Sequence, residues 1–276
     1  MMKLFLSDLD GTLIDVHGNI QQQDVQAIHT LAERGIAFGI VTGRDYGFCQ
    51  KLIRRYRLAA DMIIGNNGGS IWIRDEKVME EQIEARDVIR IMEFLKDHVD
   101  EINPFVCNEK STFFFMKEQY APKHWDEVRE QLSYLGDIAE QDLLRYLKEK
   151  QEPVVKISIH TYTQERRDTW LPILRRQFQD AYEILPTSFD YIEITRKGID
   201  KGKSFLQALE YVKLSQEEVA FIGDGANDIP LFHEVEDSFC MASCSAGSAQ
   251  RSCTCCKKCC RSCDFCYRIE YKQHSK

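Results

Sequence analysis

Short apolar runs alternate with helix-like patterns along the first 80 residues. The run Leu4–Leu6 is continuous, as in a strand buried on both faces, and residues 36–44 repeat this pattern. Between them apolar residues recur at helical spacing, and Gly35 follows the last of them, where a left-handed residue commonly ends a helix. Residues 61–73 predict a strand, a turn and another strand. This alternation predicts a doubly wound parallel sheet, an α/β fold.

The middle of the chain has a different pattern. Helices and a hairpin are predicted at residues 88–99, 105–116, 125–135 and 170–178. In residues 154–160, apolar residues alternate with Lys156, Ser158 and His160, which predicts a strand with one solvated face. Helices mixed with hairpins are typical of an α+β unit, which we expect to be inserted at residues 84–188.

The first pattern then returns and suggests the domain organisation. A helix that begins near Phe205 is followed by residues 218–232, which predict a buried strand ending in an acidic loop. The chain is therefore predicted to form a Rossmann-like core from residues 1–83 and 189–276, with the α+β cap of residues 84–188 inserted between them.

The acidic composition narrows the range of partners. The chain has 36 Lys and Arg against 44 Asp and Glu, a net charge of −8, and so lacks the basic excess of a nucleic-acid binder. A small anionic substrate remains compatible, because local cations can outweigh the global charge. No apolar run is long enough to span a membrane, and the first one is too short for a secretory signal. We expect a cytoplasmic protein, monomeric or weakly dimeric, that binds neither nucleic acid nor membrane.

Two carboxylates follow the first predicted strand, in the stretch KLFLSDLDGTLID. Asp8 and Asp10 would stand at the carboxyl end of this strand, where open parallel sheets bind their ligands. Other polar segments stand at later strand ends or helix starts. They are Thr42-Gly43-Arg44, Lys201, and Asp224 with Asn227 and Asp228. Loops that follow different strands could therefore converge on one site.

This set of groups suits phosphoryl transfer. A carboxylate such as Asp8 can attack phosphorus and form an aspartyl-phosphate, while Asp10 can protonate the leaving alkoxide and later deprotonate water. Anions repel each other, so a divalent cation is needed, and Mg²⁺ suits the carboxylates of Asp8 and Asp224 and the backbone carbonyl of Asp10. The phosphate oxygens could be held by the Thr42 hydroxyl, the Gly43 N–H and Lys201.

Four motifs together resemble those of the haloacid dehalogenase superfamily of phosphatases. They are DLDGTL, VTGR, the lysine of IDKGKS, and GDGAND, and their order and spacing are similar to the Cof-like subfamily, which has a large α/β cap between the second and third motifs. The resemblance covers about residues 3–245. It implies the following roles: Asp8 as nucleophile, Asp10 as acid and base, Thr42 and Lys201 at the phosphate, Asp224 as metal ligand, and Asn227 and Asp228 supporting the site, Asn227 beside the phosphate.

The predicted function is therefore Mg²⁺-dependent hydrolysis of a small phosphomonoester, and the enzyme class a phosphoric monoester hydrolase. The resemblance implies sugar phosphates or phosphorylated cofactors as substrates, and a cap that excludes bulk water. Members that pump ions or dehalogenate usually lack the second aspartate of the first motif, so Asp10 favours a phosphatase or a phosphomutase. The phosphomutase and a catalytically impaired ligand-binding homologue remain alternatives.

Three other polar features have less specific interpretations. Arg44 could contact substrate or face solvent, and the pattern favours neither. His160 is interpreted as a structural residue. Residues 66–69, Asn-Asn-Gly-Gly, predict a hairpin turn rather than a phosphate cradle, because no helix start follows them.

The tail from residue 247 is rich in cysteine and differs from the rest of the chain. The stretch CTCCKKCCRSCDFC (253–266) could be a structural zinc site, but its CxxC pairs overlap and no loop separates them. A disulfide framework would contradict a cytoplasmic location. Read one base later, cysteine codons encode valine or alanine, and the tail becomes an ordinary helix–strand–helix pattern. Our hypothesis is a frameshift near Gly247, which DNA sequencing across codons 240–276 tests.

Overall fold

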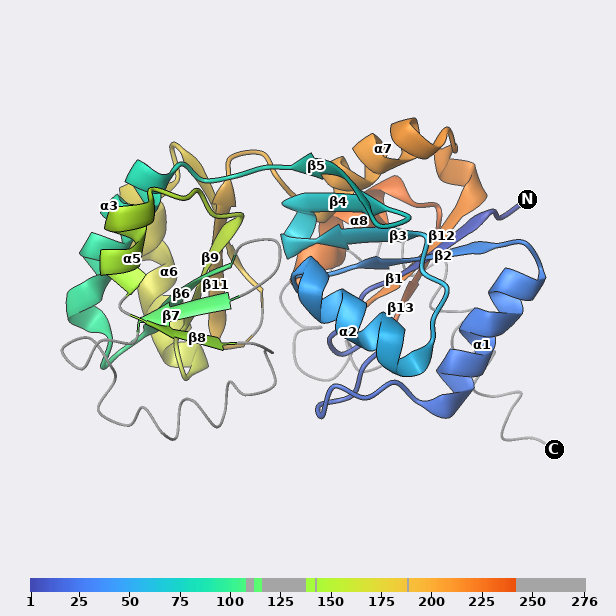
Figure 1. Cartoon of the computed structure of the whole chain (residues 1–276), viewed down its shortest axis with the longest axis horizontal. Helices are drawn as coiled ribbons and strands as arrows, with labels where there is room; N and C mark the ends of the chain where they lie inside the picture. The colour runs from blue at the N-terminus through green and yellow to red at the C-terminus, as the bar shows by residue number, and fades with distance from the viewer. Residues whose placement is uncertain (108–111, 116–137, 142, 188, 242–276) are drawn as a thin grey trace.

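The protein is described by a computed structural model in which two lobes are each built on one β-sheet (Figure 1). The described residues are 1–107, 112–115, 138–141, 143–187 and 189–241. The predicted helix over residues 125–135 and the cysteine-rich tail lie outside them. Among the described residues, no helix is both long and apolar enough to cross a membrane.

The core lobe contains a seven-stranded sheet in the order β13-β12-β1-β2-β3-β4-β5. Its strands are β1 (Leu4–Ser7), β2 (Ala37–Val41), β3 (Met62–Gly65), β4 (Ser70–Ile73), β5 (Glu76–Glu80), β12 (Val219–Gly223) and β13 (Asp237–Cys240). Strands β13, β12, β1, β2 and β3 are parallel, and β4 and β5 are antiparallel. The predicted doubly wound sheet is confirmed, with an antiparallel extension at one edge.

Helices cover both faces of this sheet. They are α1 (Gln22–Glu33), α2 (Tyr46–Tyr56), α7 (Lys201–Val212) and α8 (Ile229–Glu234), with short 3₁₀ turns η1 (Asn66–Gly68), η4 (Gln216–Glu218) and η5 (Ala226–Asp228). Because side chains alternate across a strand, Ile40 of β2 packs with the α1 and α2 residues, while Val41 packs with those of α7 and α8. Strand β1 is central, paired in parallel with both β2 and β12.

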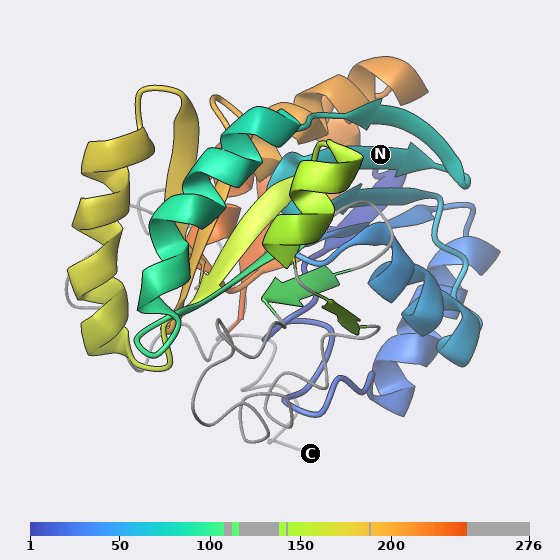
Figure 2. The same ribbon diagram turned by 60° about the vertical axis from the view of Figure 1, so that its left-hand side comes forward.

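The cap lobe contains a six-stranded sheet in the order β10-β11-β9-β6-β7-β8. Its strands are β6 (Asn103–Cys107), β7 (Thr112–Phe115), β8 (Ile138–Gln141), β9 (Lys156–His160), β10 (Tyr182–Pro186) and β11 (Tyr191–Arg196). Its helices are α3 (Ala85–Leu95), α5 (Leu143–Lys150) and α6 (Gln164–Phe178), with the 3₁₀ turn η2 (Lys96–His98). These helices cover the face of the sheet that is turned away from the core lobe (Figures 1 and 2).

The chain passes between the lobes twice, from β5 to α3 and from β11 to α7 (Figure 1). Strand β11 is hydrogen-bonded between β9 and β10, so it belongs to the cap sheet. Sheet membership therefore places the return to the core lobe after Arg196 rather than at residue 189. The division into core and cap domains itself stays a prediction.

The polar face of β9 is buried, which corrects the predicted solvated face. Lys156, Ser158 and His160 are only 5%, 1% and 5% exposed. Ile157 and Ile159 pack into the apolar core under the helices, as the alternation predicts. The opposite face lies toward the core lobe, so its polar side chains meet protein and a pocket instead of open water.

Candidate active site

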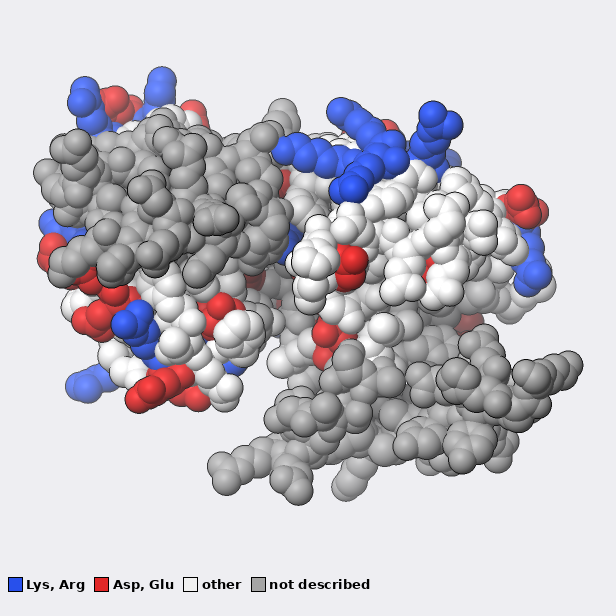
Figure 3. All heavy atoms as spheres, turned by 90° about the horizontal axis from the view of Figure 1, so that it is seen from below, with Lys and Arg blue, Asp and Glu red and all other residues white. Residues whose placement is uncertain are grey.

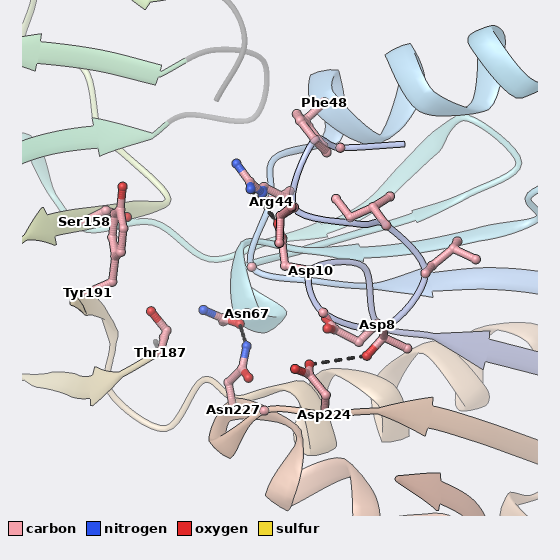
Figure 4. Close-up of a pocket in the computed structure, with 18 of the residues that line it drawn as sticks. Asp8, Asp10, Arg44, Phe48, Asn67, Ser158, Thr187, Tyr191, Asp224 and Asn227 are labelled. Atoms are coloured by element: carbon pink, nitrogen blue, oxygen red, sulfur yellow. Dashed lines mark hydrogen bonds and ion pairs between the residues drawn. The ribbon is translucent and has the colours of Figure 1, made fainter. Parts of the chain in front are cut away.

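The four polar segments meet at the carboxyl ends of β1, β2 and β12 and at the start of α7 (Figure 4). They face a pocket that residues of both lobes line. Of the predicted site residues, five line this pocket: Asp8, Asp10, Gly43, Asp224 and Asn227. Thr42, Lys201 and Asp228 are fully buried beneath it. The structure thus brings all eight predicted side chains or backbone groups together.

Lys201 lies between two buried carboxylates. Its Nζ donates to Asp8 Oδ1 at 2.8 Å and to Asp228 Oδ1 at 2.6 Å. Burial opposes the charge of Lys201, but Asp228 and Asp8 outweigh it and raise the pKa of the ammonium above its ordinary value. Lys201 is the first residue of α7, whose N-cap Asp200 accepts a hydrogen bond from the Lys203 N–H at 2.9 Å. The helix start therefore fixes the lysine in the site.

Asp228 holds the acidic loop in place from below. Its Oδ2 accepts the N–H groups of Asp224 at 3.0 Å and Gly225 at 2.9 Å, while its Oδ1 accepts Lys201. All of these bonds lie beneath the pocket, and Asp228 is fully buried. This arrangement orients the backbone from which the Asp224 side chain projects, as the supporting role predicted for Asp228 requires.

Asp8, Asp224 and Asp228 form a compact carboxylate cluster. One oxygen of each lies within 4.8 Å of the others, and Asp8 and Asp224 share a hydrogen bond (Figure 4). Burial and the nearby charge of Asp228 raise the pKa of both Asp8 and Asp224, although Lys201 opposes this. A divalent cation bound by oxygen would relieve the same repulsion, so this donor set fits Mg²⁺.

Asp10 is placed differently from the other carboxylates. Its side chain stands outside the cluster and is about half exposed, at 49%. Arg44 donates to both of its oxygens, from Nε at 2.8 Å and from an Nη at 2.6 Å. Although partial burial opposes its charge, these bonds and the Arg44 charge hold the pKa of the Asp10 carboxyl below its ordinary value. Arg44, left open by the sequence, is therefore an ion-pair partner at the pocket wall.

The turn after Asp10 requires glycine. Gly11 has φ of +80°, a left-handed conformation, and a Cβ built there would lie 2.3 Å from Asp224 Oδ2. The chain therefore passes directly against the acidic loop. This close approach brings the first and last motifs together, although they are more than 200 residues apart in the sequence.

Thr42 and Gly43 follow β2, where Gly43 lines the pocket and Thr42 is buried beneath it. The Arg44 N–H donates to Thr42 Oγ1 at 3.1 Å, and the Thr42 N–H donates to the Ile64 carbonyl at 2.8 Å. Because its oxygen already accepts one bond, the Thr42 hydroxyl keeps its own proton for another acceptor. The loop can therefore offer an O–H donor to an anion.

Asn67 is a site residue that the sequence did not identify. The hairpin turn predicted at residues 66–69 is confirmed, since β3 and β4 are antiparallel with η1 between them. Asn67 has a left-handed backbone with φ of 55°, and its N–H donates to the Thr42 carbonyl at 3.0 Å. Its Oδ1 accepts Asn227 Nδ2 at 2.9 Å, so it lines the pocket beside the last motif (Figure 4).

The cap contributes a second wall that the sequence also did not identify. Ser158, Thr187 and Tyr191 stand across the pocket from Asp10 and Asn227 (Figure 4). His160, interpreted as structural, is buried and pairs with Asp190 at 2.9 Å, although it also lines the pocket. The available signal was the alternation of polar and apolar residues in β9, which does not distinguish water from a facing lobe.

Charged side chains on the outer surface are unevenly distributed. On the face shown in Figure 3, Lys and Arg gather over one part of the core lobe, while both signs are mixed over the cap. Within the described residues visible there, no continuous basic surface joins the two lobes. The recess between the lobes is visible in the same view.

The chain is similar to known proteins in both sequence and fold. Residues 5–256 match the family model described as haloacid dehalogenase-like hydrolase. The 5-amino-6-(5-phospho-D-ribitylamino)uracil phosphatase of Bacillus subtilis is 24% identical over 84% of this chain and 81% of its own. A haloacid dehalogenase-like hydrolase from Bacteroides thetaiotaomicron has a similar structure, with a TM-score of 0.75 and 21% identity over 91% of this chain and 92% of that one. A sugar phosphatase of HAD subclass IIB has a TM-score of 0.69, with 19% identity over 87% of each chain.

Proposed function

Because the chain belongs to the haloacid dehalogenase-like hydrolases, we propose that it hydrolyses small phosphomonoesters with Asp8 as the nucleophile. The predicted enzyme class, a phosphoric monoester hydrolase, is confirmed by the family and by the names of its relatives. One observation carries the assignment of Asp8. It is the buried carboxylate at the end of β1 that contacts both Lys201 and Asp224 and also lines the pocket between the lobes.

In the proposed first step an oxygen of Asp8 attacks phosphorus. A bond forms between the carboxylate and phosphorus, the ester P–O bond breaks, and the alkoxide leaves with a proton from Asp10. Water then attacks the aspartyl-phosphate, gives its proton to Asp10, and releases inorganic phosphate and free Asp8. Lys201 holds the Asp8 carboxylate in a fixed orientation through its 2.8 Å hydrogen bond, which supports attack from one defined direction.

Asp10 must carry a proton in one step and accept it in the other. Arg44 favours the ionised form, which is the form that accepts a proton from water. Donation to the leaving group requires that Arg44 release Asp10, and the anionic oxygens of an entering phosphate offer Arg44 an alternative partner. Substrate binding would in this way change the protonation of Asp10.

The substrate phosphate would lie above the loop that follows β2. Thr42 offers a hydroxyl proton, Gly43 a backbone N–H, and Asn227 a side-chain amide at the pocket wall. Mg²⁺ would be held by Asp8 and Asp224, with Asp228 behind them, and when bound it would neutralise negative charge on the phosphate. These donors together supply the charge stabilisation that phosphoryl transfer needs.

The leaving group would lie against the cap. Ser158 and Tyr191 line the pocket on the cap side, and the aromatic ring of Tyr191 suits a substrate with a flat or ring-shaped part. Sugar phosphates and phosphorylated cofactors both meet this description, and two of the relatives above are named as phosphatases of 5-amino-6-(5-phospho-D-ribitylamino)uracil and of sugars. The cytoplasmic location and the monomeric or weakly dimeric state stay predictions.

Release of inorganic phosphate from a panel of sugar phosphates and phosphorylated cofactors tests the proposal. We expect turnover with Mg²⁺, loss of turnover with a chelator, and a fall of at least about a thousandfold in Asp8→Asn, the scale seen when a hydrolase loses its nucleophile. Asp237→Asn is the matched control, since Asp237 is exposed at the start of β13 and should leave turnover unchanged.

Three results would contradict the proposal. Turnover that survives in Asp8→Asn would exclude Asp8 as the nucleophile. A product that keeps its organic phosphate would identify a phosphomutase. A folded wild-type protein that binds phosphomonoesters without turning them over would support the impaired ligand-binding homologue instead.

A further inference from the structure

Two charged cap residues reach across the boundary between the lobes. Lys156 of β9 and Glu193 of β11 lie on neighbouring strands and are 5% and 8% exposed. Lys156 Nζ contacts Glu193 Oε1 at 2.5 Å and also donates to the carbonyl of Gly43 at 2.5 Å. Glu193 Oε2 accepts a hydrogen bond from Asn67 Nδ2. Each member of this buried pair therefore also bonds to the core lobe.

The contacts that start from Lys156, here called the lysine arm, lead to the Thr42 hydroxyl. The Gly43 carbonyl and the Arg44 N–H belong to the same planar peptide group, so a bond to one fixes the direction of the other. That N–H donates to Thr42 Oγ1 at 3.1 Å, which leaves the hydroxyl proton as the donor to any further acceptor. Lys156 thus bonds to the peptide plane whose N–H donates to the Thr42 hydroxyl oxygen.

The contacts that start from Glu193 and pass through Asn67, here called the glutamate arm, lead to the Asn227 amide. An ionised carboxylate only accepts hydrogen bonds, so Asn67 must turn its NH₂ group toward Glu193 and its oxygen the other way. Asn67 Oδ1 then accepts Asn227 Nδ2 at 2.9 Å, which sets the orientation of the second amide as well (Figure 4). A neutral side chain at position 193 could donate or accept a hydrogen bond, and so would not fix the orientations of the Asn67 and Asn227 amides.

We propose that Lys156 and Glu193 are positioning residues through which the docked cap orients two phosphate-binding groups of the core, the Thr42 hydroxyl and the Asn227 amide. The inference rests on the proposed function, because that function places both groups at the substrate phosphate. It means that the phosphate site is fully ordered only while the cap contacts the core.

The side-chain amide signals of Asn67 and Asn227 test the glutamate arm without any need for activity. The full-length protein is labelled with ¹⁵N-asparagine, and the signals are assigned with Asn67→Ser and Asn227→Ser. In Glu193→Gln we expect both amides to change chemical shift and to exchange faster with water. Glu93→Gln is the matched control, because Glu93 is a cap carboxylate that pairs with Lys96 and Lys148 at the surface. Neither amide should change in that variant.

Two outcomes would overturn the glutamate arm. Unchanged amides in Glu193→Gln would show that the carboxylate does not orient Asn67. A change confined to Asn67 would show that the order does not reach Asn227. If the wild-type protein releases no phosphate from the panel, the proposed function fails, but the amide signals still decide the inference.

Phosphate release tests whether the orientation matters for turnover. Glu193→Gln should lower kcat/KM by about 10- to 100-fold, as loss of a supporting hydrogen bond commonly does, whereas Glu93→Gln should not. Lys156→Met/Glu193→Leu removes both charges together, which buried ion pairs often tolerate without unfolding, and should show a similar fall. Folded variants with wild-type kcat/KM would overturn the positioning role.

Discussion

Each lobe buries a lysine beside the pocket, and the two lysines differ in the carboxylates around them. Lys201 of the core stands among Asp8 and Asp228, with Asp224 next to them, so one cation faces three carboxylates. Lys156 of the cap faces one carboxylate, Glu193, and the pair is neutral. The core cluster therefore keeps surplus negative charge toward the pocket, as a cation site requires, while the cap pair can only hold neighbouring groups in place.

The largest effect that tests this comparison is expected for Lys201→Met. The change leaves Asp8 and Asp228 buried without their cation, and should lower the free energy of unfolding by about 3–5 kcal/mol. Burial and like charge raise the pKa of Asp8, so protonation relieves the strain and the deficit should shrink as the pH falls. Urea unfolding at several pH values measures this.

Lys203→Met is the matched control for that experiment. Lys203 lies on the same helix with 62% of its side chain exposed, and its loss should change stability by less than about 0.5 kcal/mol. A deficit in Lys201→Met as small as that of the control would mean that the core carboxylates do not depend on this lysine.

A smaller effect of a different kind is expected from the cap wall. Tyr191→Leu removes a ring that faces the core groups across the pocket, so it should change the ratio of kcat/KM between two substrates by about tenfold. Core substitutions should instead lower turnover of all substrates by a similar factor. The measurement is kcat/KM over the substrate panel, with Tyr211→Leu, an exposed tyrosine of α7, as control. A uniform loss in Tyr191→Leu would assign the ring to the core chemistry.

The smallest expected effect is a change in the pKa of Asp10, which pairs with Arg44 at the pocket wall. Arg44→Gln removes the cation that holds the pKa of Asp10 low, so Asp10 should take up its proton at a higher pH. In the wild-type protein this ion pair stabilises the fold above the ordinary pKa of an aspartate, and its contribution is lost as the pH falls through the lowered pKa. The carboxyl ¹³C shift of Asp10 follows the titration. Arg86→Gln, at an exposed arginine of the cap, should leave it unchanged.

The sequence predicted the core lobe well because its chemistry lies in short motifs at strand ends. Asp8, Thr42 and Asp224 each follow directly on a buried strand, and parallel pairing of β1 with β2 and β12 brings them together. The same reasoning could not place the Asp10 side chain, because its direction depends on Arg44. The Asp8, Asp10 and Asp224 ligand set stays a prediction, and the side-chain cluster contains Asp228 where that set has Asp10.

The cap residues were beyond the reach of sequence patterns for a physical reason. Lys156 and Ser158 alternate with apolar residues in the same way whether their face meets water or a second lobe. Asn67 was correctly interpreted as a turn residue, but the role of its amide depends on Asn227, far away in the chain. Such contacts depend on how the two lobes pack against each other, and a single sequence does not reveal that packing.

The chain enters and leaves the cap by two neighbouring connections, from β5 to α3 and from β11 to α7. A body attached at two points retains rotation about the line that joins them, while sliding and twisting are restricted. Each return of the cap would therefore follow the same path and bring Lys156 back to Gly43 and Glu193 back to Asn67. If the cap opens and closes during turnover, the double attachment would make the register of the two lobes reproducible.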